Sequence, residues 1–185
     1  MEERLRRFYA WCDNPRRALA LVAVFLASQA AMAAMFARLP GQEGVELQLT
    51  LDPARFQSII TGWGPAGITV YLQHYWLDMI HPLWYSLALA GAWASTFSRL
   101  GFPSLTAPRW ALAGVVVPLV AGALDICENC AHIIELHWLW PGHFSAAVMY
   151  AGNLAAWTKW TLALGELVVV LVALVVLAMR KRRRG

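Results

Sequence analysis

The chain has 185 residues, of which 59% are hydrophobic and only 14% are charged. Soluble domains carry about 25% charged residues, so this composition excludes an ordinary soluble protein. The high hydrophobicity also excludes a disordered chain. The length predicts one membrane domain that covers residues 1–185.

Four segments are long and apolar enough to cross a membrane, which needs about 20 such residues. They are residues 19–39, 75–97, 110–132 and 155–179. The first resembles a signal peptide because Ala31-Met32-Ala33 is similar to a cleavage site, but its basic flank and its length favour a retained anchor. We therefore expect an all-α membrane protein with an antiparallel bundle of four transmembrane helices.

The basic residues predict the orientation of this bundle. Twelve of the fifteen Lys and Arg residues lie in the two terminal segments and in the loop at residues 98–109. The positive-inside rule then places both termini and this loop in the cytoplasm. The net charge of +4 thus reflects topology and contact with lipid headgroups. No aromatic-basic stripe or recognition helix accompanies it, so nucleic acid is not expected as a partner.

The segment between the first two spans faces outward and should be helical over residues 50–72. Asp52-Pro53 is typical of a helix start, and Gly62-Trp63-Gly64-Pro65 is typical of a turn. The short helix 53–60 between them has three apolar residues on one side: Phe56, Ile59 and Ile60. It either lies in the membrane interface or covers a site as a lid. After the turn, a second helix should run into the second span.

Ionisable side chains of the last three spans fall at nearly one depth, at the outer boundary of a core about 30 Å thick. They are Asp78, His81, Asp125, Glu128, His132 and Lys159. Helical spacing places Asp125, Glu128, Asn129 and His132 on one stripe. Pro82 should kink the second span beside His81 and free a backbone carbonyl there. Polar residues inside membrane segments are candidates for function.

Four interpretations of these residues remain open. A divalent metal could activate water, with ligands among Asp78, His81, Asp125, Glu128 and His132. Crowded carboxylates could instead do acid-base chemistry without a metal, while Lys159 holds an anionic or carbonyl group. The charges could form a purely structural ion-pair network, or a path for protons or a transported substrate. Haem between His81 and His132 is disfavoured by the surrounding carboxylates.

Cys127 and Cys130 form a C-x-x-C motif, which also occurs in membrane thiol oxidoreductases. Such enzymes need a second cysteine pair to relay electrons. Only Cys12 remains, on the cytoplasmic flank. The alternative is that both cysteines are small packing residues.

Three short motifs carry a resemblance to a known family. They are residues 75–85 (Tyr-Trp-Leu-Asp-Met-Ile-His-Pro-Leu-Trp-Tyr), 124–129 (Leu-Asp-Ile-Cys-Glu-Asn) and 158–160 (Thr-Lys-Trp). They resemble a family of small, uncharacterised bacterial four-helix membrane proteins over about residues 50–180. The resemblance singles out Asp78, Tyr85, Asp125, Glu128, Asn129 and Lys159. That family more often has an aromatic residue in place of His81, which weakens the metal hypothesis. The resemblance implies no particular activity.

We therefore expect a multi-pass protein of the bacterial inner membrane that binds or acts on a lipid or another amphiphile, either as a monomer or as a homo-oligomer. The candidate catalytic residues are Asp78, Asp125, Glu128 and Lys159. The candidate ligand-binding residues are Asn129, Tyr85, His132 and Trp160. The rival hypothesis is a non-catalytic scaffold. Direct pairing of Lys159 with carboxylates in a closed core would favour the scaffold.

Overall fold

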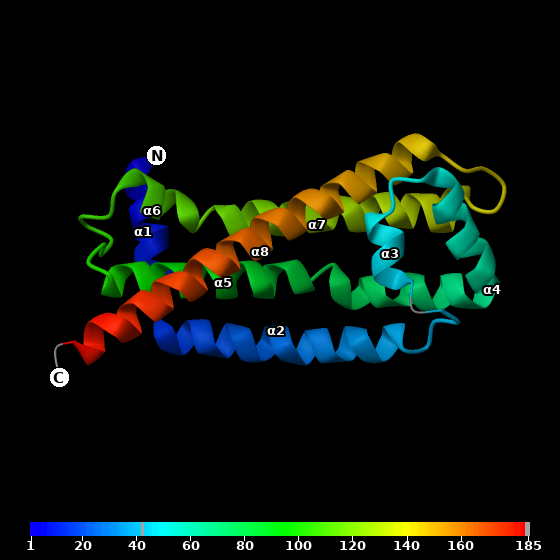
Figure 1. Ribbon diagram of the computed structural model, residues 1–185. Helices are drawn as coiled ribbons and strands as arrows, with labels where there is room; N and C mark the ends of the chain where they lie inside the picture. Colours follow the sequence, from blue (N-terminus) through cyan, green and yellow to red (C-terminus); the bar gives the residue numbers. More distant parts are fainter. Residues whose placement is uncertain (42, 184–185) are drawn as a thin grey trace. The chain divides into compact units, whose positions relative to one another are not determined.

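The computed structural model describes residues 1–41 and 43–183, which form helices joined by turns and loops (Figure 1). The helices are α1 (Glu2–Cys12), α2 (Pro15–Phe36), α3 (Gly44–Leu49), α4 (Pro53–Asp78), α5 (His81–Arg99), α6 (Arg109–Gly114), α7 (Val117–Ile133), the π-helix η1 (Ile134–Leu139) and α8 (Ala146–Arg182). The all-helical prediction is therefore confirmed for this part of the chain.

Three helical stretches are long and apolar enough to cross a membrane: Pro15–Phe36, Arg109–Leu139 and Ala146–Arg182. They are compatible with a membrane protein. They contain the third and fourth predicted spans and most of the first, whose predicted end at residue 39 lies beyond Phe36. The second predicted span is divided, because α4 ends at Asp78 and α5 begins at His81. Among the described residues there are thus three candidate spans, and the predicted bundle of four spans is not confirmed.

The predicted start and turn of the outer segment are both present in α4. Asp52 Oδ1 accepts a hydrogen bond from the backbone N–H of Ala54 at 2.9 Å, and Pro53 is the first helical residue. Gly64 interrupts the helix with φ 60° and ψ −174°, and Pro65 follows it. Glycine suits this break because residues with a Cβ rarely adopt a positive φ. The second helix continues to Asp78, as the sequence predicted.

Backbone contacts divide the chain into two compact units, and the single-domain prediction stays a prediction. The first unit contains Met1–Phe25, Leu83–Gly122 and the chain from Trp160. Its core is rich in alanine around Tyr9, Trp93 and Phe97. The Tyr9 hydroxyl lies 3.0 Å from the carbonyl oxygen of Phe102, and Trp93 Nε1 donates to the carbonyl of Ala111 at 2.8 Å. These bonds hold α1, α5 and α6 together.

We expect alkaline pH to destabilise the protein through α1. Burial raises the pKa of the Cys12 thiol to about 12 and raises the pKa of the Tyr9 hydroxyl above its usual range. An unfolded chain loses the thiol proton near pH 9, while the folded chain keeps it. The unfolded state then binds fewer protons, so the free energy of unfolding falls as pH rises from about 9 toward 12.

Unfolding titrations in detergent between about pH 8 and pH 11 measure this slope. Cys12→Ala should make it shallower, whereas Cys127→Ala, at an exposed position, should not. An unchanged slope in Cys12→Ala would contradict the role given to this thiol.

The second unit contains Leu26–Pro82 and Ala123–Lys159. Its hydrophobic core includes Phe56, Ile59 and Ile60, together with Leu47 of α3 and Met149 of α8. Phe56 and Ile60 have no exposed surface. The apolar side of the predicted helix 53–60 therefore packs into protein rather than into the membrane interface.

Candidate functional site

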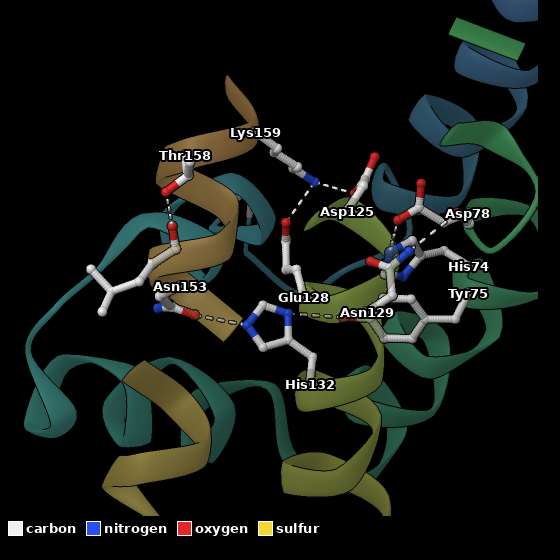
Figure 2. A network of polar contacts seen from close by, with 11 residues as sticks. His74, Tyr75, Asp78, Asp125, Glu128, Asn129, His132, Asn153, Thr158 and Lys159 are labelled. Atoms are coloured by element: carbon white, nitrogen blue, oxygen red, sulfur yellow. Dashed lines mark hydrogen bonds and ion pairs between the residues drawn. The ribbon is translucent and has the colours of Figure 1, made fainter. Parts of the chain in front are cut away.

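Lys159 of α8 forms ion pairs with two carboxylates of α7 in the second unit (Figure 2). Its Nζ contacts Asp125 Oδ1 and lies 2.6 Å from Glu128 Oε2. All three side chains are buried, and Glu128 has no exposed surface. Asp125 and Glu128 are three residues apart on one helix face, so a single ammonium group can contact both.

A third buried carboxylate, that of Asp78, lies at the break between α4 and α5. Asp78 Oδ2 lies 3.5 Å from His74 Nε2, one helical turn earlier. Pro82 has no N–H, so it cannot bond the carbonyl four residues before it, which is that of Asp78. Asn129 Nδ2 of α7 donates to this carbonyl at 3.1 Å. The carbonyl that the sequence predicted to be free is thus used to join α4 to α7.

His132 extends the network toward α8 and the outer segment. Its Nδ1 lies 3.1 Å from the Tyr75 hydroxyl, and its Nε2 lies 2.8 Å from Asn153 Oδ1. The Asn153 amide donates in turn to the backbone carbonyls of Leu47 and Thr50. Because Asn153 accepts at one end and donates at the other, it connects α7 with the residues before α4.

We call these buried residues the charge cluster: His74, Tyr75, Asp78, Asp125, Glu128, Asn129, His132, Asn153 and Lys159. The cluster contains three carboxylates and one lysine. Within the described residues, Glu128 Oε1 and Asn129 Oδ1 have no hydrogen-bond partner. An unbonded buried oxygen costs about 1–3 kcal/mol, so these two atoms are the places where the cluster could accept a further donor.

Most predicted site residues meet in this cluster. The predicted stripe on α7 is buried from Asp125 to His132, in agreement with its spacing. His81 also lies in the second unit, where its Nδ1 is 2.7 Å from Ser28 Oγ. Tyr85 and Trp160 belong to the first unit: Tyr85 is partly buried, and Trp160 is 39% exposed. Glu166, also in the first unit, is buried, and its carboxylate has no hydrogen-bond partner among the described residues.

The described residues do not support the metal interpretation. Across residues 1–41 and 43–183, no group of three or more His, Cys, Asp or Glu side chains is placed to hold a metal ion. Asp125 and Glu128 contact Lys159, and Asp78 contacts His74. The five predicted ligands are therefore buried in pairs with other residues rather than gathered around one point.

The cysteine motif lies on a different side of α7 from the cluster. Cys127 and Cys130 are free and exposed, whereas Asp125, Glu128 and Asn129 are buried. Cys12 is a buried thiol of the first unit.

A groove of about 480 Å³ lies between α4 and the end of α7 with η1. Its lining residues are Thr69, Leu72, Gln73, Tyr75, Trp76, Met79, Ile133 and His137. Tyr75 belongs both to this groove and to the charge cluster, because its hydroxyl contacts His132. The groove and the charge cluster therefore share one residue.

Sequence reasoning did not identify His74, Tyr75 or Asn153 as members of the site. His74 and Asp78 have the i, i+4 spacing of helix neighbours, so this contact had a readable signal. Asn153 had no such signal in the sequence. Two of its three hydrogen-bond partners, Leu47 and Thr50, lie more than 100 residues earlier in the chain.

Comparison with known proteins adds no relative: no family model, curated protein or solved structure matches this chain. The site must therefore be interpreted from its own chemistry.

Proposed function

We propose that this is a multi-pass protein of the bacterial inner membrane that binds a membrane amphiphile in the groove between α4 and η1. One observation carries the proposal: Tyr75 is among the residues that line the groove, and its hydroxyl lies 3.1 Å from His132 Nδ1 in the charge cluster. An occupant of the groove would thus touch a residue whose position the buried network fixes. A volume of about 480 Å³ lies in the range of small-molecule sites.

The groove is lined by both apolar and polar residues, as an amphiphile requires. Leu72, Trp76, Met79 and Ile133 provide apolar surface. Trp76 is 86% exposed and contributes to this apolar surface. The polar lining residues Thr69, Gln73 and His137 would face the headgroup or another polar end.

The proposed topology has both termini in the cytoplasm and four passes, with α4 and α5 together supplying the second pass. The concentration of basic residues at the chain ends and in the loop at 98–109 supports this orientation. Five residues of the family pattern (Asp78, Asp125, Glu128, Asn129 and Lys159) belong to the charge cluster. Their meeting supports the proposed relation to the small bacterial four-helix proteins.

Photolabelling tests the proposal. The full-length protein in phospholipid vesicles would be labelled with a long-chain fatty acid that carries a diazirine, and the labelled peptides identified by mass spectrometry. We expect labels on residues 69–79 and 133–137, and a loss of at least half of them in Trp76→Ala. The matched control is Trp138→Ala, because Trp138 is also exposed, at 72%, but does not line the groove.

Equal labelling of the wild type and Trp76→Ala would contradict an amphiphile site at this groove. So would a label spread evenly over the exposed apolar helices. Neither variant should unfold the protein, because both tryptophans are mainly exposed.

A second candidate function is the scaffold, and one observation favours it. Lys159 contacts Asp125 and Glu128 directly, and all three are buried, which is the arrangement expected of a structural network. In this case the cluster only holds α7 and α8 together, and the groove stays empty. A loss of stability on removal of Lys159, combined with no specific labelling of the groove, would select this candidate.

A further inference from the structure

The first unit contains a basic cavity of about 490 Å³ where α5 and α8 end. It is lined by Arg99, Leu100, Gly101, Leu177, Arg180 and Lys181. Three of these six residues carry a positive charge and none carries a negative one. The cavity is therefore built to receive an anion, provided that its cations are not already neutralised.

The lining cations form no ion pair with any residue that the structure describes. Among the described residues, no salt bridge involves Arg99, Arg180 or Lys181. Arg99 Nη1 donates to the Ser95 carbonyl at 2.7 Å, and Arg180 Nη1 donates to the Leu100 carbonyl at 3.4 Å. A guanidinium group has five N–H donors, so each arginine retains donors for a ligand while one bond fixes its position.

The helix dipoles oppose an anion here but are too weak to exclude one. The cavity lies at the carboxyl ends of α5 and α8, each of which carries a partial charge of about −0.5. Three full positive charges exceed the sum of these two partial charges. The balance at the cavity therefore remains positive.

The position of the cavity along α8 indicates what kind of anion it would bind. The apolar sequence of α8 ends at Met179, and the basic run begins at Arg180. Leu177 lines the cavity on the apolar side of this boundary, and Leu174 and Val175 are exposed just before it. A ligand that follows this surface would be anionic at one end and apolar at the other.

An aromatic residue marks the same boundary. Trp110, which is 51% exposed, packs edge-on against Phe97 and Phe102. These two residues closely precede and follow the cavity residues Arg99 to Gly101. Tryptophan is enriched at the headgroup level of membranes. The cavity therefore lies where a phospholipid headgroup would be found.

We propose that this cavity binds the phosphate of an anionic phospholipid, with an acyl chain along the exposed apolar surface of α8. Arg99 and Arg180 would bind the phosphate oxygens through their planar guanidinium groups, which match phosphate geometry. Lys181 would add a third positive charge. This site is separate from the groove in the second unit, so neither proposal depends on the other.

Native mass spectrometry of the full-length protein tests the site. The protein in neutral detergent would be titrated with phosphatidylglycerol, with phosphatidylcholine and with inorganic phosphate. We expect saturable binding of phosphatidylglycerol to be weakened about thirtyfold in the double variant Arg99→Gln with Arg180→Gln, from about fivefold for each basic residue. Inorganic phosphate should bind far more weakly, because it lacks the apolar contact with Leu177.

The matched control is Arg109→Gln with Arg182→Gln, which removes two charges of the same unit that do not line the cavity. It should weaken binding at least tenfold less than the cavity variant. The conservative variant Arg99→Lys with Arg180→Lys keeps the charges and should fall between the wild type and the glutamine variant. It also provides a folded comparison if the glutamine variant is unstable.

Three results would overturn the proposal. Equal losses in the cavity variant and the control would indicate a diffuse electrostatic attraction. Equal binding of phosphatidylcholine would remove the need for an anion. Competition by inorganic phosphate at concentrations equal to those of phosphatidylglycerol would indicate a site for a free anion rather than for a lipid.

Discussion

Replacement of Lys159 by methionine should lower the free energy of unfolding by about 3–5 kcal/mol. The substitution leaves Asp125 and Glu128 buried beside each other without the ammonium group that both contact. Leaving a buried charge unpaired costs far more free energy than the ion pair itself contributed. The expected loss of stability therefore exceeds that of breaking a surface ion pair, which is about 0–1 kcal/mol. Reversible unfolding in mixed detergent, followed by circular dichroism, measures the change.

Two further variants make this result specific. Lys181→Met replaces the only other lysine, at an exposed position, and should change stability by less than about 0.5 kcal/mol. The triple variant Lys159→Met, Asp125→Leu and Glu128→Met replaces the whole ionic group by apolar side chains and should recover most of the loss. If the triple variant is no more stable than Lys159→Met, the cost does not come from unpaired charge.

The triple variant also separates the two candidate functions. A scaffold tolerates an apolar replacement of the ion pairs once the helices pack again. If Asp125 and Glu128 instead act in acid-base chemistry or hold a cation, the triple variant should lose that function because both carboxylates have been removed. Photolabelling of the groove in the triple variant then reports whether the charges contribute to amphiphile binding.

The second large effect is expected at Asn129, whose replacement by leucine should cost about 1–3 kcal/mol. Asn129 Nδ2 is the donor to the Asp78 carbonyl, and leucine has a similar size but no donor. The carbonyl stays unbonded because Pro82 has no N–H to offer it. Adding Pro82→Ala supplies the missing N–H, so the double variant should regain part of the lost stability.

A double-mutant cycle for Asn129 and Pro82 measures this compensation as a coupling of about 0.5 kcal/mol or more. The control pairs Asn129→Leu with Pro103→Ala, which changes a proline in the loop between α5 and α6. That pair should be additive. Additivity in the Pro82 cycle as well would show that the proline does not determine how the Asp78 carbonyl is bonded.

The parts of the site that follow from local spacing could be predicted from the sequence. Asp125, Glu128, Asn129 and His132 share a face because the helix repeats every 3.6 residues. The break beside His81 follows from a proline within an apolar run. The turn at Gly64 follows from a Gly-Pro pair after a short helix. In each case neighbouring residues alone determine the geometry.

Contacts between distant segments were not predictable in this way. The fourth predicted span began at residue 155, whereas α8 begins at Ala146. Asn153 has a low helix propensity, so nothing in the local sequence favours extending the helix through it. The hydrogen bonds to His132, Leu47 and Thr50 stabilise the helix there, and they depend on tertiary structure.

The terminal helix α1 shows the same limit. The sequence indicated a basic cytoplasmic flank, but residues 2–12 form a helix with Glu2–Arg6 and Glu3–Arg7 pairs one turn apart. Such exposed pairs contribute little to stability. Burial of Tyr9 and Cys12 in the first unit contributes more, and this burial could not be read from the charge pattern.

The bonds of Asn153 and Trp157 also constrain the order in which the chain can mature. They join the backbone of residues 47–50, made early in synthesis, to a helix made more than 100 residues later. Until α8 is inserted, the carbonyls of Leu47, Leu49 and Thr50 have to be satisfied by water or by other proteins. Residues 47–50 therefore complete these hydrogen bonds only after α8 has been made, and a chain that stops after α7 would lack all three of them.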